Sequence, residues 1–143
     1  MKPQKLRQRL SVFARATPGV DHAVIVSTDG CPLAAFPAEG PAGPHPLAAV
    51  TASIGGLATA VASREPCDRY NILIDFSGGY LLISTLGEHA LLGVVAAKGA
   101  SLGAVAYQMT RFIAATRPAL ARRATVIDVA TSAAEPPIRT QTG

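Results

Sequence analysis

The segment from Arg69 to Ala97, RYNILIDFSGGYLLISTLGEHALLGVVAA, contains three short runs rich in β-branched and other apolar residues. The runs cover 69–76, 80–86 and 90–97, and short segments containing glycine separate them. Connections this short join antiparallel neighbours, because a parallel crossover needs about a dozen residues or more. The segment therefore predicts a three-stranded antiparallel meander.

A second pair of strands precedes the meander. Residues 22–27, HAVIVS, form a β-branched run, and a second short apolar run covers 32–36. Between them lies Thr28-Asp29-Gly30, and Asp-Gly between two such runs is a strong turn signal. We therefore expect a β-hairpin that turns at Asp29-Gly30. The following segment, 37–46, is rich in proline and glycine and is predicted to be a surface loop.

Two amphipathic helices are predicted, one before the first of these strands in the chain and one after the last. Leu6, Leu10 and Phe13 recur at spacings of four and three among basic residues, and Thr17-Pro18-Gly19 ends the pattern. The segment 102–116 carries a similar apolar stripe, formed by Leu102, Val105, Ala106, Met109, Phe112 and Ile113.

The end of the chain differs from the rest. Pro118 is expected to stop the last helix, because proline lacks the backbone N–H that a helix interior needs. Beyond it, residues 118–143 are mostly small or polar, with one β-prone patch at 125–129. We expect one domain over 1–117 and a flexible tail over 118–143.

A further helix, predicted over 47–63, has two dissimilar sides. Large apolar residues gather on one stripe, small residues fill the rest, and no charged side chain occurs before Arg64. Gly55-Gly56 in mid-helix needs a compensating reason, since each glycine costs about 1 kcal/mol relative to alanine. The pattern favours a helix–helix contact between subunits, and the alternative is an alanine-rich helix in a compositionally biased chain.

The charge is unevenly distributed. The 143 residues carry a formal net charge of +4, and 49% of them are hydrophobic, which suits one packed domain. Five basic residues and no acidic residue lie within the first 15 positions: Lys2, Lys5, Arg7, Arg9 and Arg15. This run is either a solvated helix face or a surface that meets anionic lipid, nucleic acid or an acidic protein.

Residue patterns that would indicate an enzyme are missing from the sequence. His22, His45 and His89 have no metal-ligand spacing, and Cys31 and Cys67 form no CxxC pair. Gly55-Gly56 is not followed by the Lys-Ser/Thr of a phosphate loop, and the basic run lacks the interleaved aromatics of a nucleic-acid platform. We therefore expect no catalytic, cofactor-binding or metal-binding residue and no nucleic-acid partner. With no membrane-spanning run and no signal peptide, we expect a cytoplasmic protein.

The predicted order is helix, hairpin, helix, meander, helix. In this order the chain resembles the Roadblock family of dynein light-chain-like domains, and over residues 5–117 it resembles the family's bacterial members in particular. Five stretches carry the resemblance: Pro18-Gly19-Val20, VIVSTDG at 24–30, LAAVTASIGGL at 47–57, GYLLI at 79–83 and LGAVAYQM at 102–109.

The resemblance implies an α/β fold of the α+β kind, a profilin-like sandwich with a five-stranded antiparallel sheet. The element order would be α-β-β-α-β-β-β-α, with the second helix on one face and the other two helices on the opposite face. It also implies a homodimer in which the second helix and the third strand meet their counterparts. On this basis the dimer interface would contain Ala48, Ala52, Gly55, Gly56 and Thr59, with Ile72 and Ile74 on the pairing strand.

The resemblance further implies a function. Bacterial Roadblock proteins of the MglB class act with small Ras-like GTPases, which predicts a non-enzymatic homodimeric regulator or adaptor that stimulates GTP hydrolysis by positioning the switch regions. Arg64 is the nearest candidate for an arginine finger, but is more simply a helix-ending residue beside the helix dipole.

Two alternatives stay open. The first is a scaffold that brings a sensor kinase or GTPase to the membrane through the basic first helix, without an effect on nucleotide turnover. It would make the protein peripheral to the membrane. The second is a small-ligand sensor in a profilin-like fold, which would need a cavity with convergent polar groups.

Overall fold

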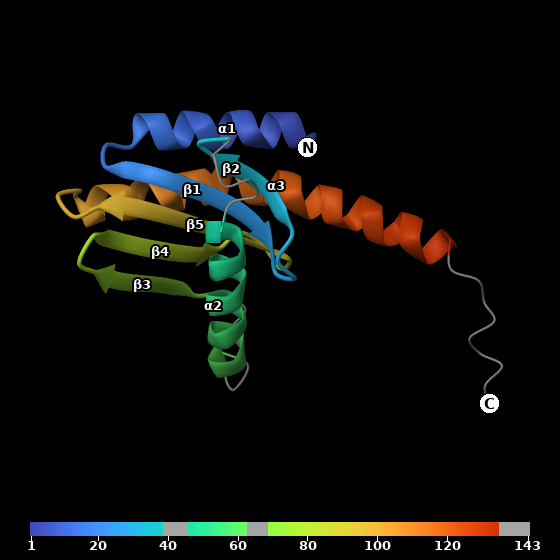
Figure 1. The fold of residues 1–143 in the computed structure, drawn as a ribbon. Coiled ribbons are helices and arrows are strands. Elements are labelled where there is room, and N and C mark those ends of the chain that lie inside the picture. The colour runs from blue at the N-terminus through green and yellow to red at the C-terminus, as the bar shows by residue number, and fades with distance from the viewer. Residues whose placement is uncertain (39–45, 63–68, 135–143) are drawn as a thin grey trace.

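The computed structural model describes residues 1–38, 46–62 and 69–134, and for residues 121–134 it describes the backbone alone. Within these residues three helices and five strands follow one another in the expected order (Figure 1). Their bounds are α1 Pro3–Ala16, β1 Val20–Ser27, β2 Pro32–Phe36, α2 Pro46–Ala62, β3 Asn71–Phe76, β4 Gly79–Thr85, β5 Ala90–Ala97 and α3 Leu102–Ala134. The predicted hairpin and meander are both confirmed.

The five strands form one antiparallel sheet in the order β2-β1-β5-β4-β3. The central junction joins the two halves of the chain, since β1 pairs with β5 from Val20 opposite Ala96 to Ser27 opposite Ala90. Gly30 supplies the positive φ of 97° in the β1–β2 turn, a conformation that glycine adopts without steric cost. β3 lies at one edge of the sheet and β2 at the other.

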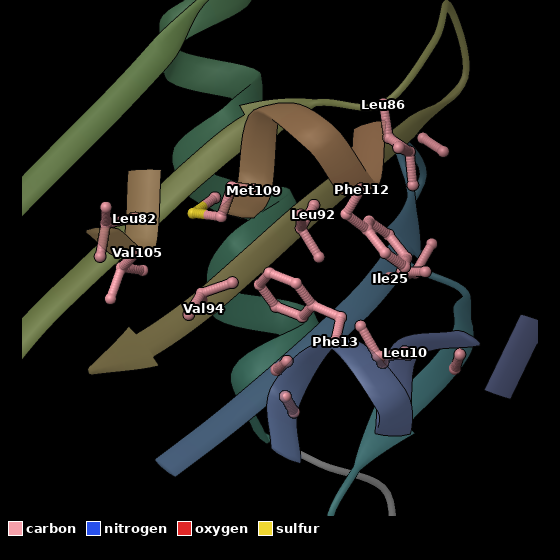
Figure 2. Packing of buried hydrophobic residues seen from close by; sticks show 14 of the residues in the cluster. Leu10, Phe13, Ile25, Leu82, Leu86, Leu92, Val94, Val105, Met109 and Phe112 are labelled. Carbon is pink, nitrogen blue, oxygen red and sulfur yellow. The ribbon is translucent and has the colours of Figure 1, made fainter. Parts of the chain in front are cut away.

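Successive residues of a strand point to opposite faces of the sheet, and both faces here carry apolar side chains. Helices cover both of these faces. One face packs against α1 and α3 (Figure 1). In that core the Phe13 and Phe112 rings, from α1 and α3, lie with centroids 5.2 Å apart (Figure 2). The other face packs against α2, where Val24, Ile83 and Leu91 are buried. The expected α+β sandwich, with two helices on one face and one on the other, is confirmed.

α2 approaches the sheet closely because small groups lie between them. A Cβ placed on Gly55 would come within 2.4 Å of Leu91 Cδ1, and one on Gly93 of β5 within 2.5 Å of Thr51 Oγ1. Thr51 is fully buried, and its hydroxyl has no hydrogen-bond partner among the described residues. The mid-helix glycine at position 55 is thus explained by packing within this chain.

The last helix corrects the prediction that Pro118 ends it. α3 continues through Pro118 to Ala134 and extends beyond the sheet (Figure 1). Pro118 removes the N–H that would bond to the carbonyl of Ala114. Contacts with the rest of the domain hold this turn: Arg9 Nη1 of α1 donates to the carbonyl of Ala115 at 3.2 Å, and Ala119 is buried.

A second contact acts on the same turn. Arg117 Nη2 donates to the carbonyl of Thr85 at the end of β4, at 3.5 Å. A proline inside a helix costs about 3 kcal/mol, and tertiary packing on both sides of the turn offsets this cost. Residues 118–134 are therefore part of α3, while the mobility expected for the tail stays a prediction.

Candidate functional site: the α2–β3 surface

The outward side of α2 is apolar and exposed. Val50, Leu57 and Val61 are 45%, 71% and 72% exposed. At 100° per residue these three side chains lie within about 40° of one another, so they form one stripe along the helix. A helix of a single folded domain usually turns charged or polar residues to water. An exposed apolar stripe is typical of a surface that contacts another protein.

The helix is oriented differently from what the sequence pattern suggested. Small residues were expected to face outward, yet Ala48 and Gly55 are buried against this chain's own sheet, and Ala52 is half-buried. Gly56 and Thr59 do face outward and are exposed. The difference follows from packing, because small residues under the helix allow its axis to come close to β5.

β3 lies beside this helix at the edge of the sheet. One side of the strand's backbone pairs with β4, and the other side has no neighbouring strand within the described chain. Ile72 and Ile74, expected on the pairing strand, are half-buried and pack with the cluster beneath α2. Leu73 and Phe76 are 54% and 41% exposed. An edge strand with exposed apolar side chains is a template for pairing with another chain.

Tyr70 joins α2 to β3. It immediately precedes β3, and its hydroxyl donates a 3.0 Å hydrogen bond to the carbonyl of Gly55. The same hydroxyl lies 3.4 Å from Thr59 Oγ1. The sequence reasoning did not single out Tyr70. Its position directly before an edge strand is the only local signal, and the partner lies fifteen residues earlier in the chain.

Lys98 holds the opposite end of β3. Its ammonium group contacts the carboxylate of Asp75, donates to the carbonyl of Phe76 at 2.9 Å, and lies 4.5 Å from the centre of the Tyr80 ring. The hydrogen bond to Asp75 raises the pKa of Lys98, since it favours the charged form. Tyr70 and Lys98 therefore tie the two ends of the edge strand to the rest of the domain.

The remaining sequence candidates are dispersed. Arg64, Cys67 and His45 lie outside the described residues. His22 is half-buried in β1, and His89 is exposed beside Glu88, at 3.8 Å. Within the described ranges no group of three or more potential metal ligands occurs. No helix in that part of the chain is long and apolar enough to cross a membrane.

An antiparallel sheet between one helix and a pair of helices, with an exposed helix beside a free strand edge, defines a class of small α+β interaction domains. Comparison with known families makes this specific. Residues 7–96 match the model of the Roadblock/LC7 domain, and the chain belongs to that family. The resemblance on which the sequence predictions rest is thereby confirmed.

Solved structures share the fold of this chain. A Roadblock/LC7 domain from Streptomyces avermitilis is 21% identical and superposes with a TM-score of 0.70, over 80% of this chain and 96% of that one. The gliding protein MglB from Thermus thermophilus is 25% identical, with a TM-score of 0.64, over 79% and 87% of the two chains. An MglB with a tetrameric arrangement is 26% identical, with a TM-score of 0.67, over 82% and 90%. Among proteins of curated function, none matches the sequence.

Proposed function

We propose that this chain forms a homodimer through α2 and β3 and that the dimer regulates a small Ras-like GTPase. Two observations carry the dimer: the exposed apolar stripe of Val50, Leu57 and Val61 on α2, and the edge of β3 that has no neighbouring strand among the described residues. Tyr70, just before β3, connects the two elements at the Gly55 carbonyl. A two-fold axis at this edge would pair β3 with its copy in antiparallel orientation and bring the two α2 stripes together. One operation would then cover both the apolar side chains and the open backbone.

The residues named from the sequence take different places in this interface. Gly56 and Thr59 are exposed on α2 and would contact the partner subunit, with Ala52 at the margin. Ala48 and Gly55 would act indirectly, since they set how closely α2 lies on its own sheet. Ile72 and Ile74 would position the backbone of the pairing strand.

The GTPase part of the proposal rests on family membership and on similarity to MglB proteins. Its mechanism would be conformational. A regulator that binds the switch regions shifts the GTPase toward the arrangement that hydrolyses GTP, and it needs only a difference in affinity between the two states. We propose stimulation of hydrolysis as the direction of the effect, and a sensor kinase as a further partner.

A nucleotide-dependent capture tests this function. The tagged chain is incubated with cytosol containing either GDP or a non-hydrolysable GTP analogue, and the bound proteins are identified by mass spectrometry. A regulator must enrich a Ras-like GTPase with one nucleotide over the other, and the purified pair must then show faster GTP hydrolysis. Equal capture in both states would instead support the scaffold alternative, and absence of any GTPase would contradict the proposal.

A further inference from the structure

Among the side chains that the structure describes, those that are charged and exposed on the α1–α3 layer are all basic. α1 and α3 lie side by side on the face of the sheet opposite α2 (Figure 1). We call their exposed surface the basic face. Its charged and exposed side chains are Lys2, Lys5, Arg7 and Arg15 at α1 and Arg111 on α3.

None of the described side chains on α1 or α3 is acidic. The sequence contains no Asp or Glu in residues 1–20 or 98–127. Among the side chains that the structure describes, the acidic groups all belong to strands and turns: Asp21, Asp29, Asp75 and Glu88. Positive charge is therefore concentrated on one side of the domain, where the field of several groups adds.

Two exposed side chains on the same face are apolar or aromatic. Val12 is 68% exposed and lies on α1 opposite its buried stripe. Tyr107 is 61% exposed on the outward side of α3, and the Arg111 guanidinium lies 6.0 Å from the centre of its ring. Basic side chains around an exposed tyrosine and valine are the combination found where a protein surface meets lipid headgroups.

We propose that the basic face docks onto an anionic lipid bilayer. Basic residues bind the headgroups electrostatically, while Val12 and Tyr107 enter the interfacial region. Each basic residue near such a surface strengthens binding about fivefold. On α3 the exposed residues near Tyr107 and Arg111 are small, among them Gly103, Ala104 and Ala106, so no large side chain there would hold a planar partner away.

Other occupants fit the face less well. A second copy of the same face would bring like charges together, which is unfavourable. Single-stranded nucleic acid is bound through aromatic side chains that stack on successive bases. Among the described residues of this face, Tyr107 is the one exposed aromatic side chain.

A dimer would bring two basic faces to the same membrane. This part of the inference rests on the dimer proposed above. A two-fold axis perpendicular to the sheet keeps both α1–α3 layers on the same side of the continuous sheet. The dimer would then present two basic faces to one membrane plane and bind with higher avidity than a single domain. The α2 helices would lie on the side away from the lipid.

Sedimentation with vesicles tests the inference on the full chain. The expected result is binding to vesicles of phosphatidylcholine and phosphatidylglycerol in a two-to-one ratio, none to phosphatidylcholine alone, and release at high salt. The variant Lys5→Gln/Arg111→Gln removes one charge from each helix at exposed positions and should bind about thirtyfold more weakly.

A matched control separates local charge from net charge. Thr28→Glu/His89→Glu lowers the formal charge by the same amount at exposed turn positions away from the helices, and it should keep most of the binding. Light scattering on each preparation reports the dimer independently, so vesicle binding and the proposed function can fail separately. Equal loss in both variants, absence of vesicle binding, or capture by duplex DNA without vesicle binding would overturn the proposal.

Discussion

The hydroxyl of Tyr70 donates a hydrogen bond to the carbonyl of Gly55, and this contact crosses from the start of the edge strand to the middle of the helix above it. Gly55 is also the residue whose missing side chain lets α2 lie against Leu91. One position of the helix thus contacts both the central strand β5 and the segment leading into β3. The proposed interface elements are therefore held in a fixed relation to each other before any partner binds.

Replacing Tyr70 by Phe should lower the free energy of unfolding by about 1 kcal/mol, because the ring stays and only the part-buried hydrogen bond is lost. Urea denaturation followed by circular dichroism measures the change. As a control, Tyr107→Phe removes a hydroxyl from a side chain that is 61% exposed, and it should leave the free energy of unfolding unchanged. An equal effect of both substitutions would mean that the Gly55 contact contributes nothing to stability.

The two adjacent glycines should respond in opposite directions to alanine. A Cβ at Gly56 meets no atom within 4 Å, so Gly56→Ala should stabilise the monomer fold by up to about 1 kcal/mol through helix propensity. A Cβ at Gly55 would collide with the buried Leu91 side chain, so Gly55→Ala should destabilise by about 1–2 kcal/mol. Thermal unfolding of both variants in the Leu57→Asp background, which is expected to be monomeric, checks this, and the same sign for both would contradict the described packing of α2.

Thr51 offers a substitution that should stabilise. Its hydroxyl is buried and has no partner among the described residues, and valine has nearly the same shape. Thr51→Val should raise the free energy of unfolding by about 1 kcal/mol, because an unpaired buried hydroxyl carries a desolvation cost. Thr28→Val, at an exposed position of the β1–β2 turn, is the control in the same denaturation experiment and should leave the free energy of unfolding unchanged.

The proposed dimer depends on the outward stripe of α2. Leu57→Asp places a charge at a position that is 71% exposed, so the subunit should fold normally but no longer dimerise. Gly56→Leu should weaken the dimer by steric obstruction, since that position is open in the single chain. Light scattering gives the mass. Val12→Asp, at 68% exposure on α1, should remain dimeric, and a dimer that survives both α2 substitutions would place the interface elsewhere.

Lys98 should make the anchoring of β3 sensitive to alkaline pH. Its pKa is raised in the folded state by the hydrogen bond to Asp75, so the stabilisation is complete below the pKa of an unfolded lysine and is lost as pH rises through the folded value. NMR titration of the Lys98 side chain should show a lower pKa in Asp75→Asn. The effect on global stability should be small, because the pair is exposed.

The positions of the strands could be predicted from the sequence because the residue patterns that define strands and turns are local. Runs of β-branched residues separated by glycine-containing turns define the hairpin at Asp29-Gly30 and the meander over 69–97 without reference to distant residues. Which side of α2 packs on the sheet could not be predicted in this way. Both sides of that helix are apolar, so the pattern does not say which side packs on the sheet, and the decision depends on Gly93 and Leu91 of a strand nearly forty residues later.

Pro118 is a single residue whose effect on the structure also depends on distant parts of the chain. Locally, proline favours the end of a helix, and the sequence alone supports that prediction. The observed continuation is accompanied by contacts with distant residues, among them Arg9, whose guanidinium donates to Ala115 more than a hundred residues further along the chain. Tyr70 was missed for a similar reason, since its importance comes from a carbonyl on another element.

The pairing of β1 with β5 also has a consequence for how the chain is made. Ser27 lies opposite Ala90, the first residue of β5, so the apolar β1 leaves the ribosome long before its central neighbour exists. At about 5–20 residues per second, the interval between the two strands is several seconds. During this time β1 has only β2 beside it and α1 above it, and its other edge is open to incorrect pairing. Nascent chains stalled before residue 90 should therefore be the species most prone to aggregate and most in need of a chaperone.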